Sequence, residues 1–179
     1  MIGREAQLAD LQAFLDRPGP VRVRVITGGG GSGKTRLALE LCEQRAAAGW
    51  DAGFATSSKM KSLLDAPNRS TWGWQRPTLV VIDYAAQHAE KLGPWLDELA
   101  DAETRGLPPL RLLLLEREAR TESGWWREVF ESGGYGAAAK RALLDPPHPW
   151  ELLPLGKVED RVAVLAAHGP VTGLPVPPR

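Results

Sequence analysis

Apolar residues follow two patterns along this chain: helical spacing in some segments, and short continuous or alternating runs in others. The helical spacing predicts helices at 4–16, 34–48, 88–104, 125–130, 137–144 and 157–167. The runs predict strands at 21–27, 51–56, 78–83, 110–115 and 150–155. Because strands separated by helices need crossover connections, this order predicts a mainly parallel five-stranded sheet with helices on both faces, a three-layer α/β fold.

The chain of 179 residues is long enough for one domain of this kind. We expect the domain to occupy residues 1–167. Residues 168–179 hold four prolines. This composition predicts a tail, or the start of a linker to a further C-terminal region.

The stretch between the first predicted strand and the second predicted helix carries the strongest chemical signal. Residues 28–35 read Gly-Gly-Gly-Gly-Ser-Gly-Lys-Thr and fit the phosphate-binding pattern G-x-x-x-x-G-K-[ST], the P-loop or Walker A motif. With this chain's frequencies of Gly, Lys and Ser/Thr, a chance match is expected in roughly half a percent of chains. The motif also lies between a strand and a helix, as a working P-loop must. The pattern therefore predicts a P-loop NTPase core.

Each residue type in the motif suits a polyphosphate. Glycines let backbone N–H groups approach phosphate oxygens closely, and the helix that begins near Gly33 directs free N–H groups at the same place. Lys34 is predicted to reach the β- and γ-phosphates, and the hydroxyl of Thr35 to bind Mg²⁺. The predicted nucleotide-binding set is Gly28, Gly29, Gly30, Gly31, Ser32, Gly33, Lys34, Thr35 and Arg36.

A second motif lies at the end of the predicted strand at 78–83. The β-branched and aliphatic residues of this strand are typical of one covered on both faces. The run ends in Asp83, the arrangement called Walker B. In P-loop enzymes this carboxylate holds Mg²⁺, directly or through water. The alternative is an aspartate that caps the next helix. Its place about 48 residues after the P-loop favours Mg²⁺ binding by Thr35 and Asp83, with Lys34 and Asp83 as catalytic residues.

Charged residues also follow the strand at 110–115. Ligands of open α/β sheets bind at the carboxyl ends of the strands, which is where Glu116 and Arg117 are expected. Both are therefore candidates for sensing the γ-phosphate. The alternative is a solvated charge cluster without a role in the site.

Net charge, cysteine content and the length of the apolar runs bear on possible partners, disulfides and location. Lys and Arg total 22, as do Asp and Glu, so the net charge is zero. This balance predicts no nucleic-acid partner, and a local basic patch is the alternative. The single cysteine, Cys42, excludes an intrachain disulfide and predicts a buried structural thiol. No apolar run is long enough to span a bilayer, and no signal segment is apparent at the N-terminus, so we expect a cytoplasmic protein without membrane contact.

Several features together resemble the bacterial signal-transduction ATPases with numerous domains (STAND), relatives of the AAA-type ATPases. Residues 2–5, Ile-Gly-Arg-Glu, resemble the hydrophobic-Gly-Arg-Glu box that opens their nucleotide domain. Residues 79–85 resemble the Walker B segment of an actinobacterial-type branch. Residues 112–117 resemble the fourth strand, which ends in a sensor arginine, and 152–155 resemble the fifth. The resemblance covers about residues 2–165.

The resemblance implies more than the residues alone. It implies strand order 5-1-4-3-2, ATP or ADP with Mg²⁺ as ligands, Arg4 near the adenine, and Arg117 as the sensor. It also implies a regulatory switch, in which the nucleotide sets the arrangement of this domain against C-terminal sensor and effector regions or a protein partner, with oligomerisation on activation. On this view the sequence is the nucleotide core alone.

One departure from the hydrolytic relatives concerns the residue after Asp83. Many of them carry a glutamate near the Walker B aspartate to polarise the attacking water, whereas here Asp83 is followed by Tyr84, Ala85 and Ala86. A tyrosine is a poor base at neutral pH. Glu116 or Glu90 could replace the missing glutamate. The sequence therefore predicts firm nucleotide binding with slow or partner-dependent ATP hydrolysis.

Two other functions compete with the switch. A small P-loop kinase needs an arginine-rich lid and an acceptor site, and transfer of phosphate to an acceptor would identify it. An interaction module with a degenerate nucleotide site is the third reading. Failure of every nucleotide to raise the melting temperature would favour that module.

Overall fold

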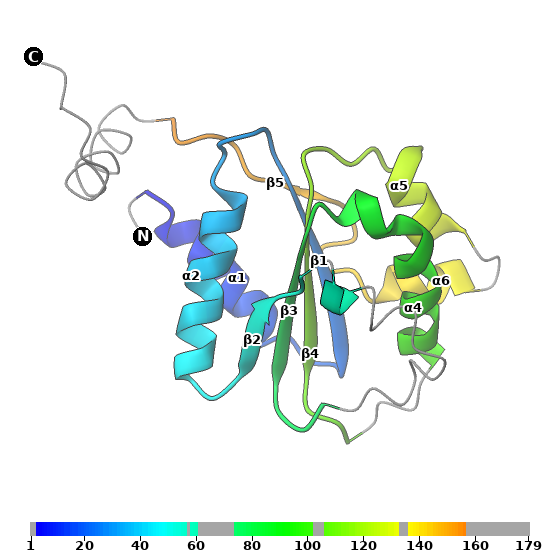
Figure 1. Cartoon of the computed structure of the whole chain (residues 1–179), viewed down its shortest axis with the longest axis horizontal. Helices are drawn as coiled ribbons and strands as arrows, with labels where there is room; N and C mark the ends of the chain where they lie inside the picture. Colours follow the sequence, from blue (N-terminus) through cyan, green and yellow to red (C-terminus); the bar gives the residue numbers. More distant parts are fainter. Residues whose placement is uncertain (1–2, 57, 61–73, 102–105, 133–135, 157–179) are drawn as a thin grey trace, which may run out of the picture.

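A five-stranded parallel sheet forms the centre of the computed structural model, which describes residues 3–56, 58–60, 74–101, 106–132 and 136–156 (Figure 1). The strands are β1 (Val21–Thr27), β2 (Asp51–Phe54), β3 (Thr78–Asp83), β4 (Leu110–Leu115) and β5 (Trp150–Glu151). Their order is β2-β3-β4-β1-β5, which is the expected order 5-1-4-3-2 counted from the other edge. All four strand pairings are parallel.

Helices cover both faces of the sheet, so the predicted three-layer α/β fold is confirmed (Figure 1). One face carries α1 (Glu5–Leu15) and α2 (Lys34–Ala47). The helices of the other face are the 3₁₀-helix η2 (Ala85–His88), α4 (Ala89–Asp101), α5 (Gly124–Trp126), the π-helix η3 (Arg127–Glu131) and α6 (Gly136–Ala142).

The hydrophobic core consists of two layers separated by the sheet, and β4 contributes to both. All six residues of β4 are buried. Leu112 and Leu114 pack with the α4 and η3 side, whereas Leu113 and Leu115 pack with α1 and α2. A strand covered on both faces favours apolar side chains on both sides, which explains the five leucines among its six residues.

One polar residue interrupts that run, and it holds α1 in place. Arg111 is 2% exposed, and its Nε donates to the carbonyl of Leu15 at the end of α1, 3.0 Å away. Its Nη1 donates to the carbonyl of Gly19 over 3.1 Å. Burial, followed by the nearby Arg22, lowers the pKa of Arg111 to about 10. The guanidinium thus satisfies carbonyls where α1 ends and the chain turns into β1.

The fifth strand is shorter than predicted. The range 150–155 was expected, but only Trp150–Glu151 pairs with β1, opposite Ile26 and Thr27. One further bond runs from the N–H of Leu152 to the carbonyl of Thr27 over 2.7 Å. Pro154 has no N–H to continue the ladder, so the chain leaves the sheet there. The predicted helix at 157–167 and the predicted tail lie outside the described residues.

Candidate functional site

The P-loop connects the end of β1 to the first turn of α2. Gly28, Gly31 and Gly33 have φ values of +154°, +76° and +94°. At Gly28 a Cβ atom would lie 2.5 Å from the carbonyl oxygen of Leu152 and 2.8 Å from the hydroxyl oxygen of Ser32. Gly28 therefore has no room for a side chain, and the loop packs tightly against the segment that follows β5.

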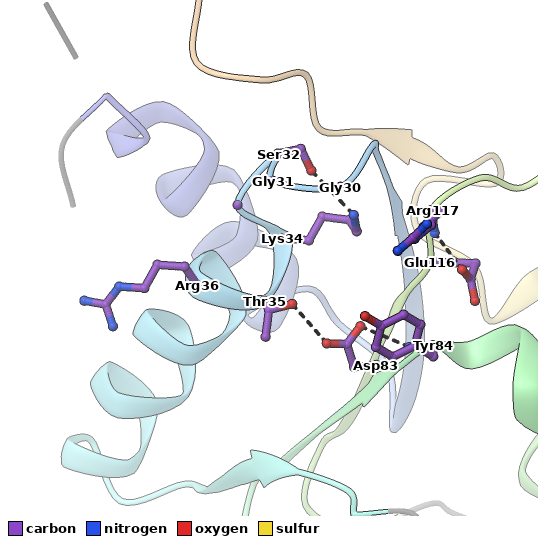
Figure 2. Close-up of a pocket in the computed structure, with 11 residues that line it drawn as sticks. Gly30, Gly31, Ser32, Lys34, Thr35, Arg36, Asp83, Tyr84, Glu116 and Arg117 are labelled. Atoms are coloured by element: carbon purple, nitrogen blue, oxygen red, sulfur yellow. Dashed lines mark hydrogen bonds between the residues drawn. The ribbon is translucent and has the colours of Figure 1, made fainter. Parts of the chain in front are cut away.

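The loop lines a pocket of about 260 Å³ at the carboxyl edge of the sheet (Figure 2). The ends of β3 and β4 form the opposite wall. The lining residues are Gly30, Gly31, Ser32, Gly33, Lys34, Thr35, Arg36, Asp83, Tyr84, Glu116 and Arg117. The structure thus brings together most of the residues that the sequence singled out from three separate segments.

Thr35 and Asp83 meet in this pocket. The hydroxyl Oγ1 of Thr35, in the first turn of α2, donates to Oδ2 of Asp83 over 2.9 Å (Figure 2). Lys34 lies beside them. Its Nζ donates to the carbonyls of Gly28 over 2.5 Å and Gly29 over 3.3 Å, so its ammonium is held over the loop. A hydroxyl and a carboxylate are suitable oxygen ligands for Mg²⁺, and the ammonium supplies charge for phosphates.

Tyr84 follows Asp83 in a backbone conformation that is uncommon for its residue type. Its φ of 55° and ψ of 50° are left-handed, and no other non-glycine residue in the described ranges has a positive φ. Such a conformation costs about 1–2 kcal/mol. Its N–H donates to Oδ1 of Asp83 over 3.0 Å, and its carbonyl accepts from Gln87 over 3.0 Å. Its side chain lines the pocket and is half-exposed.

Glu116 and Arg117 directly follow β4 and form hydrogen bonds with two other segments of the pocket. The Glu116 carboxylate accepts the N–H of Arg117 at Oε1, 2.7 Å away, and the N–H of Ala86 at Oε2, 3.0 Å away. The carbonyl of Arg117 accepts the N–H of Gly28 over 3.1 Å. The Arg117 side chain is exposed and extends from β4 toward the P-loop (Figure 2). Both carboxylates of the pocket, Asp83 and Glu116, are therefore held by hydrogen bonds.

Two of the predicted nucleotide-binding residues, Arg36 and Arg4, direct their guanidinium groups to protein atoms. Arg36 points away from Lys34 and Asp83 (Figure 2). Its Nη2 lies 3.4 Å from Oε2 of Glu40, on the next turn of α2. Arg4 is buried, and its guanidinium donates to the backbone carbonyls of Ser32 and Leu153. It also lines a neighbouring pocket of about 260 Å³, formed with the segment 150–156.

Glu90, the other candidate base, is exposed in the first turn of α4 and does not line the P-loop pocket. The backbone of Leu152 and Leu153 also supports the P-loop, Leu152 directly at Gly28 and Leu153 through Arg4, and no motif in the sequence indicates this. Every residue has a backbone carbonyl, so the residue types at 152 and 153 do not indicate such a contact. The requirement for glycine at position 28 is the one trace of it in the sequence.

Comparisons with known proteins find a likeness in fold rather than in sequence. No protein-family model and no curated protein matches the sequence. The ORC2 protein of Aeropyrum pernix, solved as ADPNP–ADP complexes, matches with a TM-score of 0.62 and 17% identity over 94% of this chain and 52% of that chain. Domain III of the replication initiation protein DnaA from Thermotoga maritima matches with a TM-score of 0.59 and 18% identity over 98% and 72%.

These likenesses, together with the sheet order and the loop between β1 and α2, decide the fold. The fold is that of a P-loop NTPase. A third similar structure is the A. pernix ORC1 protein in complex with DNA, with a TM-score of 0.57 and 12% identity over 96% of this chain and 50% of that chain. This chain therefore spans about half the length of the ORC proteins that it matches.

The expectation of no nucleic-acid partner, drawn from the net charge, is wrong. The A. pernix ORC1 protein, which this chain resembles in fold, is solved in complex with DNA. Net charge sums the whole chain, whereas contact with a phosphate backbone depends on the charge of one face. A net charge of zero therefore does not exclude a nucleic-acid partner.

None of the helices in the described part of the chain is long and apolar enough to cross a bilayer.

Proposed function

We propose that this chain is the nucleotide-binding domain of a regulatory ATPase, which binds ATP or ADP with Mg²⁺ and acts as a nucleotide-dependent switch. The hydrogen bond between Thr35 and Asp83 carries the proposal. It joins the residue that follows the P-loop lysine to the end of the Walker B strand. This pair supplies oxygen ligands at the place where the P-loop would present the phosphates.

The charges around the pocket support a polyphosphate ligand. Lys34 and the N-terminus of α2 lie on one side, and the Arg117 side chain extends toward them from β4. Lys34 would bind the β- and γ-phosphates, and Arg117 would sense the γ-phosphate. Bound Mg²⁺ would neutralise part of the phosphate charge, held by Thr35 and Asp83.

The base would occupy the neighbouring pocket lined by Gly3, Arg4 and residues 150–156. Its location next to the P-loop supports this assignment, as does the resemblance of residues 2–5 to a box that lies near the adenine in STAND proteins. ATP rather than GTP follows from the same resemblance.

Hydrolysis by the isolated chain would be slow. Of the two carboxylates in the pocket, Asp83 accepts from Thr35 and Tyr84, and Glu116 accepts from two backbone N–H groups. Tyr84 stands where a base would be expected and is a poor base at neutral pH. We therefore assign the chain a role in holding the nucleotide, with turnover dependent on a partner, a second copy or a C-terminal region.

The switch would act on the regions that follow β5 in the chain. Residues 1–167 would form the nucleotide domain, joined through 168–179 to sensor and effector regions, as in STAND proteins. About half of each similar ORC chain lies outside the match, which is consistent with such an arrangement. The hydrogen bond that the N–H of Ala86 donates to Glu116 would relay a change at Arg117 to η2.

Amide hydrogen exchange of three samples tests the switch: the chain alone, with ADP and Mg²⁺, and with a non-hydrolysable ATP analogue and Mg²⁺. We expect protection of residues 28–36 with either nucleotide. The two nucleotides should differ at residues 83–88, which lie next to the proposed γ-phosphate sensor. Identical exchange with both nucleotides would rule out a switch within this domain.

A further inference from the structure

Arg4 is a buried cation whose hydrogen bonds link three separate segments. The residue is 4% exposed, and it directly precedes α1. Its Nη2 donates to the carbonyl of Ser32 in the P-loop over 2.8 Å and to the carbonyl of Leu153, after β5, over 2.6 Å. One guanidinium thus joins the N-terminal segment, the phosphate-binding loop and the exit from the sheet.

A second set of contacts joins two of these segments. The N–H of Leu152 donates to the carbonyl of Thr27, just before the loop, over 2.7 Å. The carbonyl of Leu152 lies where a Cβ atom on Gly28 would meet it at 2.5 Å. The segment 152–153 therefore contacts the P-loop at two places. It meets Gly28 directly and is linked to Ser32 through Arg4.

The partners of Arg4 are neutral carbonyls. No ion pair joins it to a carboxylate in the described ranges, and burial lowers its pKa. Burying a cation in this way costs stability unless its donors are satisfied. A bridge between two carbonyls satisfies donors on Arg4 and, at the same time, fixes the distance between the loop and segment 152–153.

We infer that Arg4 is a positioning residue: it holds the P-loop in its phosphate-binding shape and couples the loop to the chain that leaves β5. This inference rests on the proposed nucleotide site. It adds to the expectation that Arg4 lies near the adenine, because here the guanidinium acts on the backbone of Ser32 and Leu153. A change at the P-loop would then reach residues after Leu153 without passing through β3 or β4.

The choice of ligand separates positioning from contact with the base. Inorganic triphosphate has the phosphates of ATP but no base, so it reports on the P-loop alone. In Arg4→Met the affinities for Mg²⁺–triphosphate and for Mg²⁺–ATP should fall by a similar factor, about tenfold. A loss confined to ATP would overturn the inference in favour of contact with the base, and no loss for either ligand would overturn it as well.

Two further variants control for damage to the fold. Arg24 is also buried, at 3% exposure, but its Nη1 bonds Asp10 and its Nε bonds the carbonyl of Asp145, away from the P-loop pocket. Arg24→Met should lower the melting temperature yet leave the triphosphate affinity within about twofold. Arg4→Lys keeps the charge but not the planar fork, so it should recover only part of the affinity.

Hydrogen exchange without nucleotide tests the coupling independently of binding. Arg4→Met should speed exchange in residues 28–33 and in residues 151–155 together, whereas Arg24→Met should speed neither. Unchanged exchange in Arg4→Met, or a change in only one of the two segments, would overturn the coupling. Absence of ATP and triphosphate binding by the unmodified protein would overturn the proposed function instead, and the exchange result would still decide the role of Arg4.

Discussion

Thr35 and Asp83 lie 48 positions apart in the sequence, yet the hydroxyl of Thr35 donates to Oδ2 of Asp83 over 2.9 Å. The other carboxylate oxygen of Asp83 accepts the N–H of Tyr84. Asp83 is therefore oriented from both sides, by the P-loop helix and by the turn that follows β3. Such a preorganised pair lowers the cost of ordering ligands when a metal ion binds.

Substitution of either member of this pair should remove the effect of Mg²⁺ on nucleotide binding. In Thr35→Ala or Asp83→Asn we expect the affinity for ATP in the presence of Mg²⁺ to fall about tenfold, a loss of about 1.4 kcal/mol. The affinity in EDTA should hardly change, because Lys34 and the loop N–H groups remain. Calorimetry with and without Mg²⁺ measures both values.

Thr56→Ala is the matched control for the threonine. Thr56 is exposed, and its hydroxyl lies 3.2 Å from that of Ser58, outside the P-loop pocket. Its removal should leave the Mg²⁺ effect intact. An undiminished Mg²⁺ effect in both Thr35→Ala and Asp83→Asn would show that the metal is held elsewhere.

Two glycines of the P-loop should respond very differently to the addition of a methyl group. In Gly28→Ala the new Cβ would meet the Leu152 carbonyl at 2.5 Å, so we expect a loss of about 1–3 kcal/mol in the free energy of unfolding and weak nucleotide binding. Gly30→Ala meets nothing within 4 Å and should leave stability nearly unchanged. Chemical denaturation compares them; equal losses in the two variants would contradict the close contact behind the loop.

Glu116 should prove to be a structural acceptor rather than a general base. In Glu116→Gln an amide NH₂ would face a backbone N–H, so we expect a loss of about 1 kcal/mol in stability. Phosphate release should change less than about threefold, whereas loss of a general base costs about 10²–10⁴. The exposed Glu90→Gln should change neither quantity. A hundredfold loss of turnover in Glu116→Gln would instead identify it as the base.

The Cys42 thiol should make stability depend on pH at the alkaline end. Burial, with a smaller effect from Glu43, raises its pKa from 9.0 to about 11. Below pH 9 the thiol is protonated in both states, and its contribution is fully present. Between pH 9 and 11 the unfolded chain loses the proton first, so the free energy of unfolding falls by about 2–3 kcal/mol.

Urea denaturation at pH 8 and pH 11 measures this loss, with Cys42→Ala as the reference for all other titrating groups. The difference between the two proteins should shrink from pH 8 to pH 11. A difference that does not depend on pH would show that the thiol is solvated in the folded protein. Thiol reagents should also react slowly with the folded protein at neutral pH.

Much of the fold follows from local patterns. The aliphatic run of β4 predicts burial on both faces, and the strand–loop–helix order predicts the P-loop. Because parallel strands end at one edge, the ends of β3 and β4 could be placed near the loop before their contacts were known. The strand order came from the family resemblance, since periodicity does not determine which strands are neighbours.

Other features depend on contacts that leave no pattern in the sequence. Arg4 binds carbonyls, and a carbonyl group is common to every residue. Arg36 directly follows Thr35, but a step of one residue turns a helix by about 100°, so the two side chains point in different directions. The left-handed backbone of Tyr84 is also unexpected, because tyrosine does not favour that conformation.

Calorimetric titration of the protein with ATP and with ADP, in the presence of Mg²⁺, tests the central claim most directly when it is paired with Lys34→Ala. Lys34 holds its ammonium over the P-loop through the carbonyls of Gly28 and Gly29. Our account predicts that the unmodified protein binds both nucleotides and that Lys34→Ala binds neither measurably. Equal affinities in the two proteins would contradict the assignment of this pocket as the nucleotide site.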